Sequence, residues 1–192
     1  MSGKIIAIVG MAGSGKSQVA DYLVKKGFLF LRMGQLTLDE VMRKGLLPTE
    51  ENERKIREGL RKEHGMAAYA ILNVPRFDEL LKKGDVIADN LLSWEEYLFL
   101  KERYGNKLFV LSIIASPSVR YNRLMKRKLK ENDKSMRRRP MTVEQAVSRD
   151  YDEIGRFQKG GPIAMADYNI INEGSVEELH ANINLALKKF GE

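Results

Sequence analysis

The sequence of 192 residues contains no cysteine, only two histidines and only one tryptophan. The absence of cysteine excludes disulfides and thiolate metal sites. His64 and His180 lack the spacing of metal ligands, so a histidine metal centre is not expected. No apolar run approaches the ~18 residues that a membrane helix needs, and the apolar run near the N-terminus is too short for a signal peptide. We therefore expect a cytoplasmic protein that makes no contact with a membrane.

Charge is abundant and unequal in sign, with 33 lysines and arginines against 26 acidic residues and a formal net charge of +7. Basic proteins bind nucleic acids or small polyanions, so the placement of the charge decides more than its sum. The hydrophobic and charged fractions, 43% and 31%, are those of an ordinary globular protein. The length suits one unit, and no linker or repeat divides it, so we expect residues 1–192 to form a single domain.

One motif dominates the sequence, the stretch G-x-x-x-x-G-K-S near the N-terminus, which follows an apolar segment and precedes helical periodicity. Its members are Gly10, Met11, Ala12, Gly13, Ser14, Gly15, Lys16 and Ser17. Glycines free the backbone to form a nest of N–H groups around a phosphate. Lys16 is then expected to reach the β- and γ-phosphates, and the Ser17 hydroxyl to ligate Mg²⁺. The pattern predicts binding of a nucleoside triphosphate with Mg²⁺.

Hydrophobic patterning predicts strands near residues 4–9, 27–33, 85–89, 107–114 and 168–172, separated by helices. This alternation predicts an α/β, three-layer phosphate-loop fold, with a five-stranded parallel sheet and helices on both faces. We expect a helix over residues 66–83, broken or kinked at Pro75, and another from Pro117 to about residue 129. Ligands should lie beyond the carboxyl ends of the strands, where the phosphate loop is.

Asp89 ends the third predicted strand, the position from which an acid holds Mg²⁺ in phosphate-loop enzymes. Arg120, Arg123 and Arg127 fall at i, i+3 and i+7, on one side of the predicted helix. The strongly basic segment that follows, 126–141, is predicted to be a lid over the nucleotide phosphates. Binding of RNA or DNA is the competing interpretation of the same charges.

Together these features resemble the adenylate kinase and dephospho-coenzyme A kinase group, and more narrowly an archaeal family of proteins related to them. The matching stretches are 10–17, 32–34, 116–120, 123–124, 149–150 and 166–174. The resemblance implies an ATP-dependent kinase in which Arg127 and Arg149 contact nucleotide phosphates and Asn172 flanks the adenine. It further implies that segment 34–83 binds the acceptor, with Gly34 and Arg61 in that site.

The acceptor side departs from the resembled pattern. Gln35 stands where an acid follows the glycine, and Leu38 stands where adenylate kinases have an arginine. A hydroxyl acceptor needs a base, which a glutamine cannot provide. Our first hypothesis is an ATP- and Mg²⁺-dependent kinase for a small nucleotide-like acceptor. The alternatives are an ATP-binding or ATP-hydrolysing regulator with an altered acceptor site, and a nucleic-acid-binding protein. A GTPase is disfavoured, because Asn106 and Lys107 are not followed by the aspartate of the guanine motif.

Overall fold

The computed structural model describes residues 3–128 and 140–191. Five strands form one parallel sheet in the order β2-β3-β1-β4-β5, which confirms the predicted fold class. The strands are β1 Ile5–Val9, β2 Leu29–Arg32, β3 Val86–Asp89, β4 Leu108–Ile114 and β5 Tyr168–Ile171. β1 is buried along its whole length, as a continuous apolar run at the centre of a covered sheet requires.

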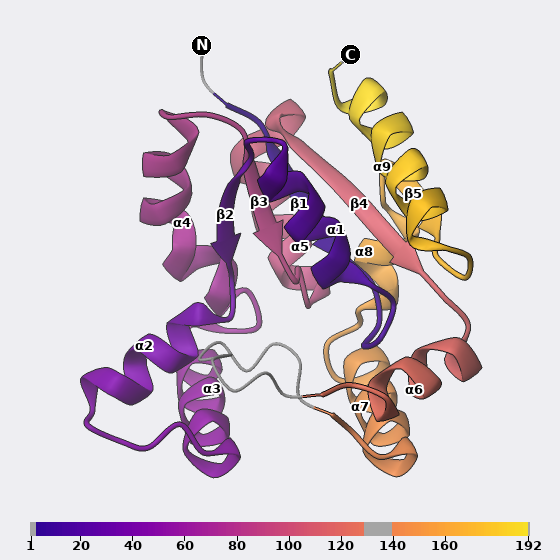
Figure 1. The fold of residues 1–192 in the computed structure, drawn as a ribbon. Coiled ribbons are helices and arrows are strands. Elements are labelled where there is room, and N and C mark those ends of the chain that lie inside the picture. Colours follow the sequence, from indigo (N-terminus) through magenta and orange to yellow (C-terminus); the bar gives the residue numbers. More distant parts are fainter. Residues whose placement is uncertain (1–2, 129–139, 192) are drawn as a thin grey trace.

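The described helices connect these strands and cover both faces of the sheet (Figure 1). Their bounds are α1 Lys16–Lys25, α2 Gln35–Arg43, α3 Glu50–His64, α4 Ala68–Leu81, α5 Trp94–Tyr104, α6 Pro117–Met125, α7 Val143–Gly155, α8 Gly160–Ala164 and α9 Val176–Gly191. One core packs α4 and α5 on one face through Phe77 and Leu100. The other packs α1 and α9 on the opposite face through Leu23 and Ile183. None of the helices in the described ranges is long and apolar enough to cross a membrane.

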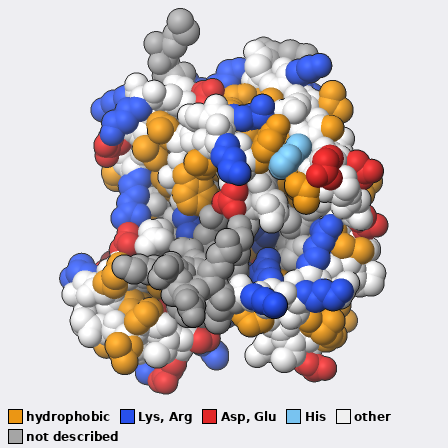
Figure 2. Space-filling model, viewed as in Figure 1, with side chains coloured by type: hydrophobic (Ala, Val, Ile, Leu, Met, Phe, Trp, Pro, Cys, Tyr) orange, Lys and Arg blue, Asp and Glu red, His pale blue; other side chains and the backbone are white. Residues whose placement is uncertain are grey.

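Beyond the carboxyl ends of the strands, α2 and α3 lie on one side and α6 and α7 on the other (Figure 1). The loop after β1 lies at this same edge of the sheet, as crossover connections of parallel strands dictate. Figure 2 shows Lys and Arg side chains gathered where this loop and α6 lie. Most of the segment 126–141, which the sequence predicts to be a lid, lies outside the described residues.

Three features of the helices differ from the sequence-based expectation. α4 runs unbroken through Pro75, so a break there was wrong; the fully buried Asn73 and Phe77 anchor the helix on both sides of the proline. α6 ends at Met125 because the chain turns, and the carbonyl of Leu124 accepts a hydrogen bond from the N–H of Met141 at 3.3 Å. The short helix α8 was not expected, since glycine and proline dominate its sequence.

Candidate functional site

The phosphate loop connects β1 to α1 and is held in a conformation that only glycine tolerates at key positions. Gly10 and Gly13 have φ values of 144° and 82°. A Cβ at Gly10 would lie 2.3 Å from the carbonyl oxygen of Ile113, and one at Gly13 would lie 2.6 Å from that of Arg120. The loop is therefore packed against β4 and α6, and its glycines are required by close approach as well as by backbone angle.

Lys16 begins α1 and folds back over the loop. Its ammonium donates hydrogen bonds to the carbonyl oxygens of Gly10 and Met11, at 2.8 and 3.1 Å. Burial of the ammonium, reinforced by the charge of Lys159, lowers the pKa of Lys16 to about 7, while the carboxylate of Glu153 acts in the opposite direction. A cation in such a poorly solvated position gains strongly from an anionic ligand.

Glu153 on α7 is the carboxylate whose charge acts most strongly on Lys16, ahead of Asp89. It pairs with Lys159 through Oε2 at 2.9 Å and with the Nε of Arg149 through Oε1 at 2.9 Å. Burial by itself would raise the pKa of Glu153, but the charges of Lys159, Arg149 and Lys16 outweigh it and lower the pKa to about 2. Glu153 thus stays ionised at neutral pH beside Lys159 and Arg149, whereas Lys16, with a pKa of about 7, is only partly protonated there.

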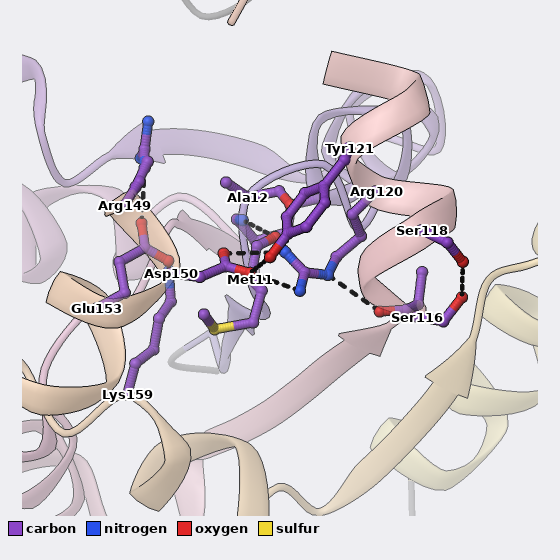
Figure 3. A network of polar contacts seen from close by, with 12 residues as sticks. Met11, Ala12, Ser116, Ser118, Arg120, Tyr121, Arg149, Asp150, Glu153 and Lys159 are labelled. Atoms are coloured by element: carbon purple, nitrogen blue, oxygen red, sulfur yellow. Dashed lines mark hydrogen bonds and ion pairs between the residues drawn. The ribbon is translucent and has the colours of Figure 1, made fainter. Parts of the chain in front are cut away.

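Arg120 fixes the loop from the side of α6 (Figure 3). Its guanidinium pairs with both carboxylate oxygens of Asp150, at 2.9 and 2.7 Å, and Nη1 also donates to the carbonyl of Ala12 at 3.1 Å. The hydroxyl of Tyr121 donates to the same carboxylate at 2.9 Å. The sequence placed Arg120 on a basic helix face, but its side chain is 5% exposed and acts as a buried link between α6, α7 and the loop.

Asn172 follows β5 and closes the loop from the other side. Its amide nitrogen donates to the carbonyl of Ser14 at 2.8 Å, and its own carbonyl accepts from Arg123 at 2.8 Å. A cavity of about 380 Å³ opens beside it. The lining includes Gly13, Gly15, Ser17, Arg123, Arg127, Asn172 and Gly174. The predicted adenine-flanking residue thus lies at a cavity that is continuous with the phosphate loop.

Ser17 and Asp89 offer oxygen ligands at the same edge of the sheet. Asp89 ends β3, is 5% exposed, and is in register with Ile8 of β1, two residues before the loop begins at Gly10. Among the described residues there is no cluster of three or more acidic or histidine side chains that could hold a metal by itself. A hydroxyl and one carboxylate still fit Mg²⁺, since this ion is usually bound by one or two carboxylates plus substrate phosphates and water.

The predicted acceptor segment contains an unusual arginine. The guanidinium of Arg61 on α3 lies over the rings of Tyr69, at 5.0 Å, and Phe157, at 4.6 Å. Its Nε is buried and has no hydrogen-bond partner among the described residues. Burial lowers the pKa of this arginine. A cation held between two rings with an unused donor is suited to receive an anion.

Gly34 directly precedes α2, and α2 contacts one of the two rings that lie under Arg61. Thr37, in the first turn of α2, shares a 2.6 Å hydrogen bond with the hydroxyl of Tyr69, the ring under Arg61. A Cβ on Gly34 would meet nothing within 4 Å, so the position does not require glycine for packing. Gln35 donates to Asp39 at 3.1 Å, and Asp39 in turn pairs with Arg76 at 2.7 Å.

The structure brings most of the predicted site residues to one edge of the sheet, but not all as expected. Arg127 lines the cavity beside Asn172, yet it lies beyond the end of α6, so its predicted place on the face of a helix was wrong. Sequence reasoning missed Asp150, Glu153 and Lys159. The spacing of Arg149 and Glu153, four residues apart on a helix, was a usable signal for an ion pair. Nothing in the sequence marks Lys159, which follows α7 in a turn.

The chain is similar in sequence and in fold to several known proteins. Residues 6–150 match the model of a family described as an AAA domain. A UPF0200 protein from Thermococcus gammatolerans is 33% identical over 187 residues, which cover 96% of this chain and 94% of that protein. Among solved structures, TT1252 from Thermus thermophilus aligns with a TM-score of 0.67 at 19% identity, covering 98% of both chains. A shikimate kinase from Acinetobacter baumannii, in complex with shikimate, aligns with a TM-score of 0.60 at 17% identity, covering 97% and 94%.

These likenesses support a phosphate-loop kinase-like fold, as the resemblance implied. They do not single out the adenylate kinases or the dephospho-coenzyme A kinases, so that narrower part of the resemblance stays a prediction.

Proposed function

The chain belongs to the UPF0200 family and to the AAA domain family, and from its site we propose that it is an ATP-dependent phosphotransferase for a small nucleotide-like acceptor. The observation that carries this proposal is the group of cations beside the loop, where Lys16, the buried Lys159 and the half-exposed Arg149 lie around the carboxylate of Glu153. Such a cluster is suited to the charge that develops in phosphoryl transfer.

On the donor side, residues 10–17 would bind the phosphates of ATP through backbone N–H groups. Lys16 would exchange its two carbonyl partners for phosphate oxygens, and Arg127 and Arg149 would add charge at the transferring group. Mg²⁺, held by Ser17 and Asp89, would neutralise part of the phosphate charge when bound. The cavity beside Asn172 has room for the nucleoside.

On the acceptor side, segment 34–83 would hold the second substrate. The unused Nε of Arg61, between two aromatic rings, supports an acceptor that carries an anionic group and a planar or apolar part. Gly34 would contribute through the start of α2. We propose that residues 1–192 act as one unit, with 126–141 as its lid; a cytoplasmic location stays a prediction.

One observation favours the regulatory alternative, in which ATP is bound or hydrolysed without transfer. Gln35 has no carboxylate to act as a base, and it is engaged with Asp39 rather than directed by a charged partner at the loop. If Gln35 stands where a base would act on a hydroxyl acceptor, the protein would bind ATP and transfer slowly.

A transfer assay with γ-labelled ATP and a panel of nucleotides and cofactor precursors tests the proposal. Transfer should occur to at least one anionic acceptor and be lost in Lys16→Ala. Arg61→Met should raise the KM for the acceptor at least tenfold while leaving the KM for ATP within about twofold. The matched control is Arg54→Met. Arg54 is an exposed arginine of the same helix that pairs with Glu58, so its loss should alter neither KM. ATP hydrolysis without transfer to any acceptor would favour the regulator instead.

A further inference from the structure

Glu153 joins two cations of unequal exposure. Its own side chain is 4% exposed and that of Lys159 is 0% exposed, whereas that of Arg149 is 48% exposed. One carboxylate oxygen accepts from each, at 2.9 Å. Figure 3 shows Glu153 between Arg149 and Lys159. The inner cation is therefore sequestered, and the outer one reaches the surface.

The backbone holds Lys159 in this position from two directions. The N–H of Lys159 donates to the carbonyl of Glu153 at 3.0 Å, which closes the turn after α7. The carbonyl of Phe157 accepts from the N–H of Trp94 at 3.1 Å, which ties the same turn to the start of α5. Gln158 adopts a positive φ of 49° between them. The backbone of Lys159 is thus held in place, and its fully buried ammonium donates to Glu153 at 2.9 Å.

The buried ion pair of Glu153 and Lys159 is not explained by a gain in stability. A buried ion pair is often no better than a pair of apolar side chains of similar volume, because desolvation offsets the attraction. The arrangement has a geometric consequence instead. Glu153 engages Arg149 through Nε alone, and among the described residues no other group accepts from this guanidinium. Its terminal nitrogens therefore remain available to a ligand, while the bond at Nε restrains the orientation of the planar group.

We propose that Glu153 and Lys159 are positioning residues for the transferring phosphoryl group. Glu153 aims the terminal nitrogens of Arg149 at the γ-phosphate, and Lys159 keeps Glu153 ionised and in place. This inference rests on the proposed function in one respect, namely that Arg149 contacts the phosphates of the nucleotide. It adds that the arginine acts as one part of a three-residue unit, two parts of which never touch the nucleotide.

The test measures how strongly the protein prefers a triphosphate over a diphosphate, as the ratio of the dissociation constants of ADP and adenylyl imidodiphosphate in the presence of Mg²⁺. The variants are Arg149→Met, the neutral pair Glu153→Gln with Lys159→Met, and all three substitutions together. Arg149→Met and the neutral pair should each lower the preference about tenfold. The triple variant should lower it no further, because all three variants remove the same contact of Arg149 with the γ-phosphate. The exposed pair Glu79→Gln with Lys83→Met is the control and should leave the preference unchanged.

A triple variant whose loss equals the combined losses of the other two would overturn the inference, as would an unchanged preference in the neutral pair. If the neutral pair does not fold, Glu153→Asp keeps the charge and shortens the reach; it should lower the preference in the wild-type background and not in Arg149→Met. A wild type that prefers the triphosphate but phosphorylates no acceptor would contradict the proposed function and leave this inference standing.

Discussion

Arg120 and Asp150 lie 30 residues apart in the sequence and form a two-point ion pair directly behind the phosphate loop, with N–O distances of 2.9 and 2.7 Å. Both side chains are nearly inaccessible, at 5% and 8% exposure. The same guanidinium also holds the carbonyl of Ala12. The pair therefore joins α6 and α7 on either side of the undescribed segment and supports the loop at the same time.

Removing one partner of this pair should be costly. We expect Asp150→Asn to lower the free energy of unfolding by about 3–5 kcal/mol, because a buried guanidinium loses its counter-charge. The double variant Arg120→Met with Asp150→Leu should cost less than the single one, as measured by urea denaturation. Arg103→Met, which removes the exposed partner of Asp78, is the control and should cost under about 1 kcal/mol.

The affinity for ATP, measured in the same variants, should show whether the pair supports the phosphate loop in addition to stabilising the fold. The double variant should not recover wild-type affinity for ATP, because the carbonyl of Ala12 still lacks its donor. Full recovery of affinity together with stability would mean that the pair only holds the helices together.

Lys16→Ala should lower ATP turnover by roughly 100-fold or more, since it removes the cation nearest the loop. The fold should be retained, because among the described residues the hydrogen bonds of this ammonium go to the loop carbonyls of Gly10 and Met11 and to no other element. Turnover and circular dichroism are measured together. Lys25→Ala, at the last turn of the same helix, is the control. Unchanged turnover in a folded Lys16→Ala protein would rule out the phosphotransferase proposal.

Asp89→Asn should weaken the apparent affinity for Mg²⁺ roughly 10- to 100-fold, the range typical of carboxylates around a metal. Asp85→Asn is the matched control on the neighbouring segment, since Asp85 accepts from the backbone N–H of Lys4 at 2.8 Å, away from the loop edge. Binding of the ATP analogue is titrated against Mg²⁺ concentration. Equal effects of the two substitutions would remove Asp89 from the metal site.

The sequence could predict the loop and the sheet because both follow from local rules. Glycine spacing reports the backbone conformation of residues 10–17, and continuous apolar runs report buried strands such as β1. These features need no knowledge of distant contacts. The fold class was therefore accessible before any coordinates.

The supporting charges could not be predicted in the same way. Arg120 and Lys159 look like solvated basic residues in the sequence, and only tertiary packing brings Asp150 and Glu153 to them. A helix boundary likewise depended on a distant contact, because α6 ends where Leu124 binds Met141. Sequence periodicity does not indicate which distant residues form these ion pairs or this helix-ending hydrogen bond.

A final prediction concerns Glu96, which is 1% exposed at the start of α5 and accepts from the N–H groups of Leu92 and Ser93. Burial raises the pKa of Glu96 from 4.5 to about 7, although these hydrogen bonds and the charge of Arg61 act in the opposite direction. The folded protein therefore binds a proton between about pH 4.5 and 7 that the unfolded chain has released. Stability from this group is complete below pH 4.5 and falls as the pH rises through that window.

Glu96→Gln should remove this dependence, because the amide oxygen can still accept from Leu92 but cannot ionise. Between pH 5 and pH 8, the free energy of unfolding of the variant, relative to the wild type, should rise by on the order of 3 kcal/mol. Urea denaturation at both pH values measures it. The control is Glu79→Gln. Glu79 is an exposed glutamate whose pKa is lowered by Lys83, so the free energy of unfolding of this variant, relative to the wild type, should not rise over this pH range. A pH-independent difference for Glu96→Gln would show that this carboxyl remains ionised in the folded protein, with the charge of Arg61 outweighing its burial.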